Sequence, residues 1–276
     1  MRNHFLRAAA GNTTSAGFPG VTDNLSVHWD FGDSNSWSGG TAVTDLTGNG
    51  NGGTLVGDTG GASATDFSAQ TDNGGFIRFS IDEDDHPKIR RDGTDFFDSI
   101  TDDDFTLEFW VRPYWNANVS GTENFHIFTN FPSSTQNLRV ILRNNNNNLR
   151  LRAAFHGSFM YLTSGNAFNV SPNAFASNWS HIVITRGDAS SSELKPSTYK
   201  VYVNNSNVFS TQTVSGNYGS ATSASVRLIG GSNTTSTSET VRYQGDFAVY
   251  RFYNGKALTS TEVTTNYNVS STRFGL

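Results

Sequence analysis

Apolar and polar residues alternate with a period of two over many short stretches of this chain. Between Leu25 and Phe31 every second residue is apolar, and the same alternation runs through Phe105–Val111 and Tyr199–Val203. Successive side chains of a β-strand point to opposite faces of a sheet, so each stretch offers one apolar face to a core. About eleven such strands, with no helical periodicity between them, predict an all-β fold, an antiparallel sandwich or barrel.

Two parts of the chain depart from this pattern. Residues 1–24 join a short basic and aromatic stretch to one rich in Gly and Ser, which predicts an N-terminal arm and linker ahead of a domain over residues 25–276. Near the other end, Thr259 and Glu262 have the spacing of a capping box, with apolar residues one turn apart behind them. One short C-terminal helix is therefore expected.

The composition excludes several classes of protein. The chain has no cysteine, which removes disulfides, thiolate catalysis and cysteine-ligated metals. Its formal net charge of −5 disfavours a nucleic-acid binder, because such proteins present a basic surface to phosphate. Without a run of about 18 apolar residues, no membrane insertion is expected. Arg7 interrupts the apolar stretch at the start of the sequence, so we expect no signal peptide.

A series of stretches follows one another in a recognisable order. They are Trp29–Phe31, Val43–Leu55, Phe105–Pro113, Asn178–Arg186, Tyr199–Asn204 and Gly245–Asn254. In this order they resemble the laminin-G-like, concanavalin A-like lectin/glucanase jelly roll, over about residues 25–276. The ending Asn266–Leu276 is more narrowly similar to laminin-G-like domains in virion structural proteins of tailed, especially marine, bacteriophages. The resemblance implies an antiparallel two-sheet β-sandwich of the jelly-roll kind, preceded by the extended arm.

The resemblance also implies a function. It indicates a non-enzymatic virion structural protein of a tailed phage, either a capsid decoration or a tail-surface protein. Such a protein is made in the host cytoplasm, resides on the virion surface and displays a lectin-like sandwich for adhesion to host-surface glycans. The expected partners are major capsid or tail subunits, further copies of the chain and a glycan. A free carbohydrate-binding module or lectin is one alternative, and a glycoside hydrolase is another.

The acidic residues lack the pairing that hydrolysis of glycosides requires. Such enzymes hold two carboxylates about 5–10 Å apart across a sugar-binding cleft. In the glucanase branch of the resembling family the pair lies on one strand as Glu-x-Asp-x-x-Glu. Glu83–Lys88 departs from this pattern at its last position and contains a proline, and Glu108 has no acidic residue two or three positions away. We therefore expect no catalytic residues and no enzymatic activity.

Two aspartates are the candidate metal ligands. The resemblance implies one structural calcium ion near the turn after the first strand and near the acid of the last long strand, which correspond to Asp45 and Asp246. Aspartate is also a common turn residue, so a purely structural role stays open. The acidic runs at 82–85 and 102–104 are interpreted as calcium ligands or as solvated loops. No other cofactor is expected.

Two groups of residues are candidates for ligand binding. Trp37, Tyr114 and Trp115 lie in predicted loops, where an aromatic ring can stack on a sugar, although most aromatic residues of such a chain belong to its core. Four arginines share one face of a predicted hairpin: Arg139, Arg143, Arg150 and Arg152. This basic surface suits a sulfated or carboxylated glycan or an acidic partner. The alternative is a solvated outer sheet face.

The N-terminal arm is the candidate assembly element. Its first residues have too few apolar neighbours to fold alone; they include Arg2, His4, Phe5, Leu6 and Arg7. Phe5 and Leu6 are expected to be buried against a partner subunit, while the two arginines pair with its carboxylates or carbonyls. We predict that residues 1–20 attach the protein to the virion.

Overall fold

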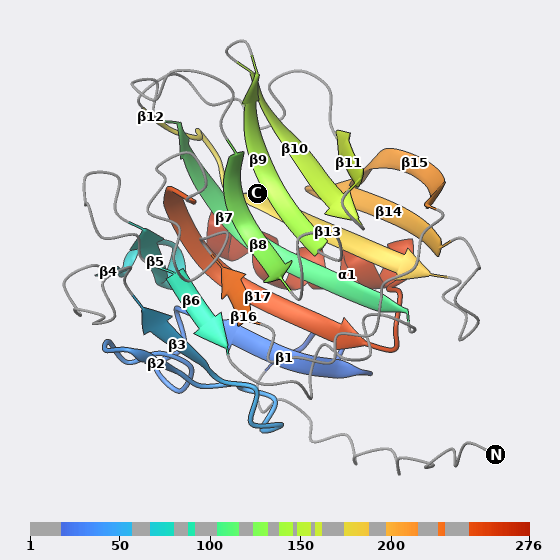
Figure 1. The fold of residues 1–276 in the computed structure, drawn as a ribbon. Helices are drawn as coiled ribbons and strands as arrows, with labels where there is room; N and C mark the ends of the chain where they lie inside the picture. The colour runs from blue at the N-terminus through green and yellow to red at the C-terminus, as the bar shows by residue number, and fades with distance from the viewer. Residues whose placement is uncertain are drawn as a thin grey trace.

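Two antiparallel β-sheets face each other in the computed structural model and enclose the main core between them (Figure 1). The structure describes residues 18–56, 67–79, 88–91, 104–115, 124–131, 138–145, 148–155, 158–161, 174–187, 197–214, 226–229 and 243–276. The predicted all-β sandwich with one short C-terminal helix is confirmed, and its arrangement is consistent with a jelly roll.

The first sheet has nine strands among the described residues. Its order is β15 (Ser206–Val214), β14 (Ser197–Val203), β13 (Ser180–Gly187), β7 (Phe105–Trp115), β17 (Gly245–Asn254), β5 (Phe76–Phe79) and β4 (Phe67–Gln70), while β1 (Leu25–Asp30) pairs with β17 and β12 (Ala174–Phe175) with β7. At its centre β7 and β17 pair antiparallel over their length, from Gly245 opposite Pro113 to Asn254 opposite Phe105. These two long strands position most of the candidate functional residues.

The second sheet has eight strands in the described part of the chain. Its order is β11 (Ser158–Tyr161), β10 (Asn148–Phe155), β9 (Leu138–Asn145), β8 (Asn124–Phe131), β16 (Val226–Ile229), β6 (Lys88–Arg91), β3 (Gly53–Val56) and β2 (Ala42–Val43). Each described pairing in it is antiparallel. Alternation on β9 and β10 turns one side of that hairpin toward the core and the other away from it.

Inward side chains of β7, β8 and β17 form the middle of the core. The ring of Phe109 stacks on that of Tyr250 with centroids 5.6 Å apart, and the Phe128 ring of the second sheet lies 6.1 Å from both. All three are buried, and burial of one such side chain stabilises the fold by roughly 1.5–3 kcal/mol. The same alternation turns the even-numbered residues of β7, from Thr106 to Tyr114, toward the outer face of the first sheet.

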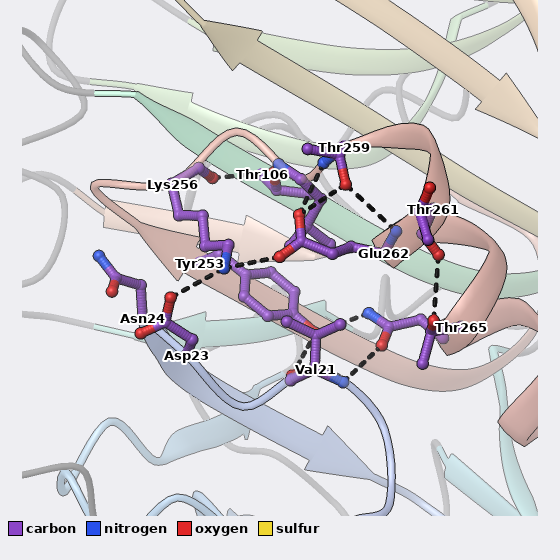
Figure 2. Close-up of polar contacts among 12 residues, drawn as sticks. Val21, Asp23, Asn24, Thr106, Tyr253, Lys256, Thr259, Thr261, Glu262 and Thr265 are labelled. Carbon is purple, nitrogen blue, oxygen red and sulfur yellow. Dashed lines mark hydrogen bonds and ion pairs between the residues drawn. The ribbon is translucent and has the colours of Figure 1, made fainter.

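Helix α1 (Ser260–Ser271) lies against that outer face and continues into η4 (Thr272–Phe274); a further short turn, η1 (Asp72–Gly74), precedes β5 (Figure 1). The predicted capping box is present, because Glu262 N–H donates to the Thr259 hydroxyl and Thr259 N–H donates to the Glu262 carboxylate (Figure 2). Beyond the helix, the Phe274 ring stacks on Trp110 with centroids 4.3 Å apart. No helix among the described residues has the length and apolar character needed to cross a membrane.

The segment just ahead of β1 differs from the prediction. Val21 N–H donates to the side-chain oxygen of Asn266 at 2.8 Å, and the Tyr253 hydroxyl donates to the Val21 carbonyl at 3.0 Å. Asp23 pairs with Lys256, Oδ2 to Nζ, at 2.8 Å (Figure 2). Residues 18–24 therefore belong to the domain, and the prediction that they form a linker is wrong. The assembly candidates Arg2, His4, Phe5, Leu6 and Arg7 lie outside the described residues.

Candidate functional site

Glu108 lies at the centre of a buried polar network between β7 and α1. Its Oε1 accepts hydrogen bonds from Arg251 Nη1 and from His181 Nε2, the latter at 3.0 Å, and its Oε2 accepts one from Asn266 Nδ2 at 2.8 Å. Burial raises the pKa of the Glu108 carboxyl, but Arg251, His181 and Asn266 together lower it from 4.5 to about 2. The carboxylate is therefore charged, fully buried and occupied by protein donors.

Asp246 is the second buried carboxylate of the first sheet, and two arginines meet it. Arg78 on β5 donates from Nε to Oδ1 at 2.7 Å and from Nη2 to Oδ2 at 3.2 Å. Arg112 on β7 donates from Nε and Nη2 to Oδ2 at 2.8 and 2.6 Å. The Asp246 side chain is 0% exposed, whereas those of Arg78 and Arg112 are 33% and 23% exposed. We call these three residues the Asp246 cluster.

Aromatic rings lie around the two arginines of the Asp246 cluster. The Phe175 ring centroid is 4.4 Å from the Arg78 guanidinium carbon and 5.3 Å from that of Arg112. The buried Phe76 ring is 5.8 and 5.6 Å from the same two carbons. Phe175 stands directly opposite Tyr114 where β12 pairs with β7, their rings edge to face at 5.1 Å. Phe175 and Tyr114 are both half-buried, so the cluster reaches the surface beside two aromatic rings.

The geometry does not favour the calcium site predicted at the two aspartates. Asp45 is buried and accepts four hydrogen bonds, from the N–H groups of His28, Thr47 and Asn51 and from the Thr47 hydroxyl. A carboxylate has about four lone-pair positions, and four protein hydrogen bonds reach each of the two aspartates, divided evenly between the oxygens of Asp45 and with three of the four on Oδ2 of Asp246. In the part of the chain that the structure describes, the two aspartates have different hydrogen-bond donors. Among the described residues no group of three or more His, Cys, Asp or Glu could hold a metal ion.

Two of the three aromatic candidates for sugar stacking lie in the core. Trp37 is buried against Phe31, and its Nε1–H donates to the Gly40 carbonyl at 2.9 Å. Trp115 is not in a loop but is the last residue of β7, where alternation turns it inward, and it is 2% exposed. The prediction that these rings are available to a sugar is therefore wrong. Tyr114, its neighbour on the strand, faces outward beside the Asp246 cluster.

The four predicted basic residues lie on the outer side of the β9–β10 hairpin, and we call them the arginine face: Arg139, Arg143, Arg150 and Arg152. Their neighbours Val140, Leu142 and Leu151 point into the core between the sheets. Arg143 stands directly opposite Arg150, and Arg152 stands opposite Ile141. The four arginines are half-buried, while Ile141 between them is 1% exposed, as expected where long side-chain stems cover an apolar residue.

A buried histidine borders the arginine face. His126 on β8 pairs with Ile141 in the sheet register, and its Nδ1 lies 2.9 Å from the Thr129 hydroxyl. Burial, together with the charge of Arg139, lowers the pKa of His126 from 6.5 to about 3. Burial also lowers the pKa of Arg139 itself. His126 is thus neutral near pH 7 and adds no charge to this surface.

A cavity of about 190 Å³ lies where the chain enters β1. Its walls include Phe18, His28, Arg251 and Arg273. The Phe18 ring centroid is 3.8 Å from the Arg251 guanidinium carbon and 5.0 Å from the His28 ring. Burial, followed by the charge of Arg251, lowers the pKa of His28 well below its ordinary value. Both arginines are paired inside the protein, Arg273 with Asp30 at 2.7 Å and Arg251 with Glu108.

Sequence reasoning missed Arg78, Arg112 and Phe175. A charged residue inside an apolar stretch was the available signal, since Arg78 interrupts Phe76–Phe79 and Arg112 ends the alternation that begins at Phe105. Their positions in the sequence do not show that they lie close together, because Arg78 and Asp246 are 168 residues apart.

Comparison with known proteins supports the fold. A family model described as the concanavalin A-like lectin/glucanases superfamily matches residues 92–264. No curated protein matches the sequence.

Solved structures share the architecture at low sequence identity. Domain 4 of AbnA, a GH43 extracellular arabinanase from Geobacillus stearothermophilus solved in complex with arabinotriose, is 19% identical with a TM-score of 0.56, over 88% of this chain and 98% of that one. The binding domain of botulinum neurotoxin DC, solved with rat synaptotagmin II and with SialylT, is 11% identical with a TM-score of 0.56, over 90% of this chain and 52% of the toxin chain. At these identities the likeness shows the fold alone.

Proposed function

Because the chain belongs to the concanavalin A-like lectin/glucanase superfamily, we propose that it is a non-enzymatic, lectin-like structural protein of a tailed-phage virion that binds acidic glycans of the host surface. The arginine face is the observation that supports this function most directly. The similar arabinanase and toxin domains were solved with arabinotriose and with SialylT, so carbohydrate binding occurs on this architecture.

The arginine face suits an acidic glycan because of how its charges are arranged. Arg143 and Arg150 are directly opposite on neighbouring strands, where side chains lie about 5 Å apart at Cβ. A sulfate or carboxylate that lies across the two strands accepts paired N–H donors from a guanidinium. Because the arginines are half-buried, their stems are already ordered and lose little freedom when a glycan binds.

The absence of catalysis is part of the proposal. Glu108 is the acid that a strand-borne catalytic pair would require, and it is fully buried with three protein donors on its oxygens. A carboxyl whose pKa is lowered to about 2 does not act as a general acid near pH 7. Release of reducing sugar from a panel of polysaccharides, lost in a Glu108→Gln variant, would overturn this part.

Glycan binding can be measured by calorimetric titration with dextran sulfate, with neutral dextran as the matched probe. We expect dextran sulfate alone to bind, with affinity that falls steeply as salt is raised. A double substitution, Arg143→Gln with Arg150→Gln, should weaken binding at least about tenfold, because two charge-assisted contacts are lost. Lys200→Gln removes one exposed charge from β14 and is the control for general electrostatic attraction. Equal weakening in both variants contradicts a specific site.

We propose that residues 1–17 attach the protein to the surface of a phage virion. The ending Asn266–Leu276, which resembles that of laminin-G-like domains in phage virion proteins, supports the choice of a phage. Residues 18–24 pack on the sandwich, so the shortened chain for this test must begin at Phe18. We expect this chain to keep its melting temperature and to fail to join particles in a reconstitution assay. Normal incorporation into particles would refute the proposal.

A free carbohydrate-binding module is the second candidate. The chain matches 98% of an arabinanase domain that was solved with arabinotriose, which favours this candidate specifically. It predicts tight binding of neutral arabino-oligosaccharides by the chain beginning at Phe18, with no dependence on particles. Calorimetry with arabinotriose separates the two functions, because the arginine face has no charge-based preference for a neutral sugar.

A further inference from the structure

We propose that the Asp246 cluster, together with Tyr114 and Phe175, forms a second binding site, for a sugar that bears a carboxylate. The site lies on the outer face of the first sheet and is therefore separate from the arginine face of the second sheet. The inference rests on the proposed lectin-like function and names a ligand class for a site that the sequence did not identify.

An excess of positive charge is the first reason. Asp246 is fully buried and supplies one negative charge, while Arg78 and Arg112 both bind it and supply two positive ones. By contrast, Arg251 and Arg273 each have a carboxylate of their own. Partly buried charge is unfavourable unless it is paired, so an anion from solution is stabilised at this cluster.

Unused donors that are already held in place are the second reason. Within the described residues, the two arginines bind Asp246 through Nε and Nη2 of each guanidinium. The Nη1 group of each arginine does not bind Asp246 and can donate to a ligand. The bonds to Asp246 fix each guanidinium plane, and the flanking rings of Phe76 and Phe175 restrict it further. Ordering these side chains on binding therefore costs little entropy.

The neighbouring aromatic pair is the third reason, and it selects a sugar. Tyr114 and Phe175 are half-buried and pack edge to face at 5.1 Å. Tyr114 lies two residues beyond Arg112 on the same face of β7, so the ring and the guanidinium are neighbours. An aromatic ring offers apolar area to the C–H face of a sugar. A planar carboxylate on that sugar then accepts from the Nη1 groups, since guanidinium and carboxylate match in geometry.

The test uses a galacturonic acid trimer as the probe and a neutral galactose trimer as its matched control, both titrated into the full chain. Amide chemical shifts followed by NMR should move at Arg78, Arg112, Tyr114 and Phe175 for the acidic trimer only. We expect Arg78→Gln to weaken the affinity about tenfold, because one charged donor group is lost while Asp246 keeps both bonds from Arg112. Tyr114→Ala should weaken it by a similar factor, and Lys200→Gln should leave it unchanged.

The outcomes separate this inference from the proposed function. If neither the acidic trimer nor dextran sulfate binds, the lectin-like function fails as a whole. If dextran sulfate binds but the acidic trimer moves no amide of the Asp246 cluster, only the second site is refuted. Equal binding of the neutral trimer also refutes it. If Arg78→Gln does not fold, Arg78→Lys serves instead, because it keeps the positive charge beside Asp246 and removes the planar guanidinium that can donate two parallel hydrogen bonds. Unchanged affinity in that variant overturns the inference.

Discussion

Replacing Glu108 by glutamine tests how the helix is held on the sheet. The substitution keeps the shape of the side chain and removes its charge, which leaves the Arg251 guanidinium buried at 2% exposure without a carboxylate. Breaking one partner of a buried ion pair costs about 3–5 kcal/mol, because an uncompensated charge stays in the interior. In a domain of this size each kcal/mol lowers the melting temperature by about 2–4 °C. We therefore expect Glu108→Gln to lower it by roughly 10 °C at pH 7.

The dependence of stability on acid pH is a second way to measure what the Glu108 carboxylate contributes. The folded pKa of Glu108 is lowered from 4.5 to about 2, so its contribution is fully present above about pH 4.5 and is lost as pH falls toward 2. One pKa unit corresponds to about 1.4 kcal/mol, so a lowering from 4.5 to about 2 corresponds to roughly 3–4 kcal/mol. We therefore expect the variant to lose much less stability than the natural protein between pH 5 and pH 2.

Urea unfolding followed by tryptophan fluorescence, repeated at several pH values, measures both effects. A double variant, Glu108→Gln with Arg251→Met, is the matched control, since it removes the stranded charge and should regain part of the lost stability. The reasoning is refuted if Glu108→Gln has the same melting temperature and the same acid limb as the natural protein. It is also refuted if the double variant is destabilised by the full sum of the single effects.

Two further outcomes are expected. Phe18→Ala should destabilise the domain by about 1–3 kcal/mol, because it removes apolar burial and the ring over Arg251. Thermal unfolding measures this loss, and an unchanged melting temperature would show that residues 18–24 are not anchored on the sandwich. Addition of calcium and then of EDTA should leave the amide signals of Asp45 and Asp246 unmoved in NMR spectra, because four protein hydrogen bonds already reach each carboxylate. A calcium-dependent shift at either residue would support the metal site.

The fold was predictable because its signal is local. Alternation over Phe105–Val111 and Tyr199–Val203 depends on neighbouring residues only, and both stretches are strands. The capping box at Thr259 is equally local. By contrast, the docking of Val21 on Asn266 joins residues 245 positions apart, and nothing in the Gly-rich segment itself indicates it.

The candidate sites were less predictable for a related reason. The predicted alternation ran over Phe105–Val111, and Tyr114 and Trp115 were predicted to lie in a loop. In the structure β7 continues, because the Pro113 carbonyl accepts from Ala176 N–H at 2.8 Å and β12 pairs with the strand end. Continued alternation then buries Trp115 and turns Tyr114 outward. The surroundings of Asp246 depend on three strands from distant parts of the chain, which spacing does not reveal.

The buried network also bears on how an N-terminal attachment would act on the sandwich. Asn266 accepts from Val21 N–H through its oxygen and donates through its nitrogen to Glu108 and to the Tyr253 hydroxyl. One helix residue thus joins the segment ahead of β1 to the centre of the first sheet. If a partner holds residues 1–17, it is joined to a segment that is hydrogen-bonded directly to β17 and to α1. Several attached copies would then hold their sandwiches close to the particle, and the spacing between copies would set the effective concentration for multivalent adhesion to a surface.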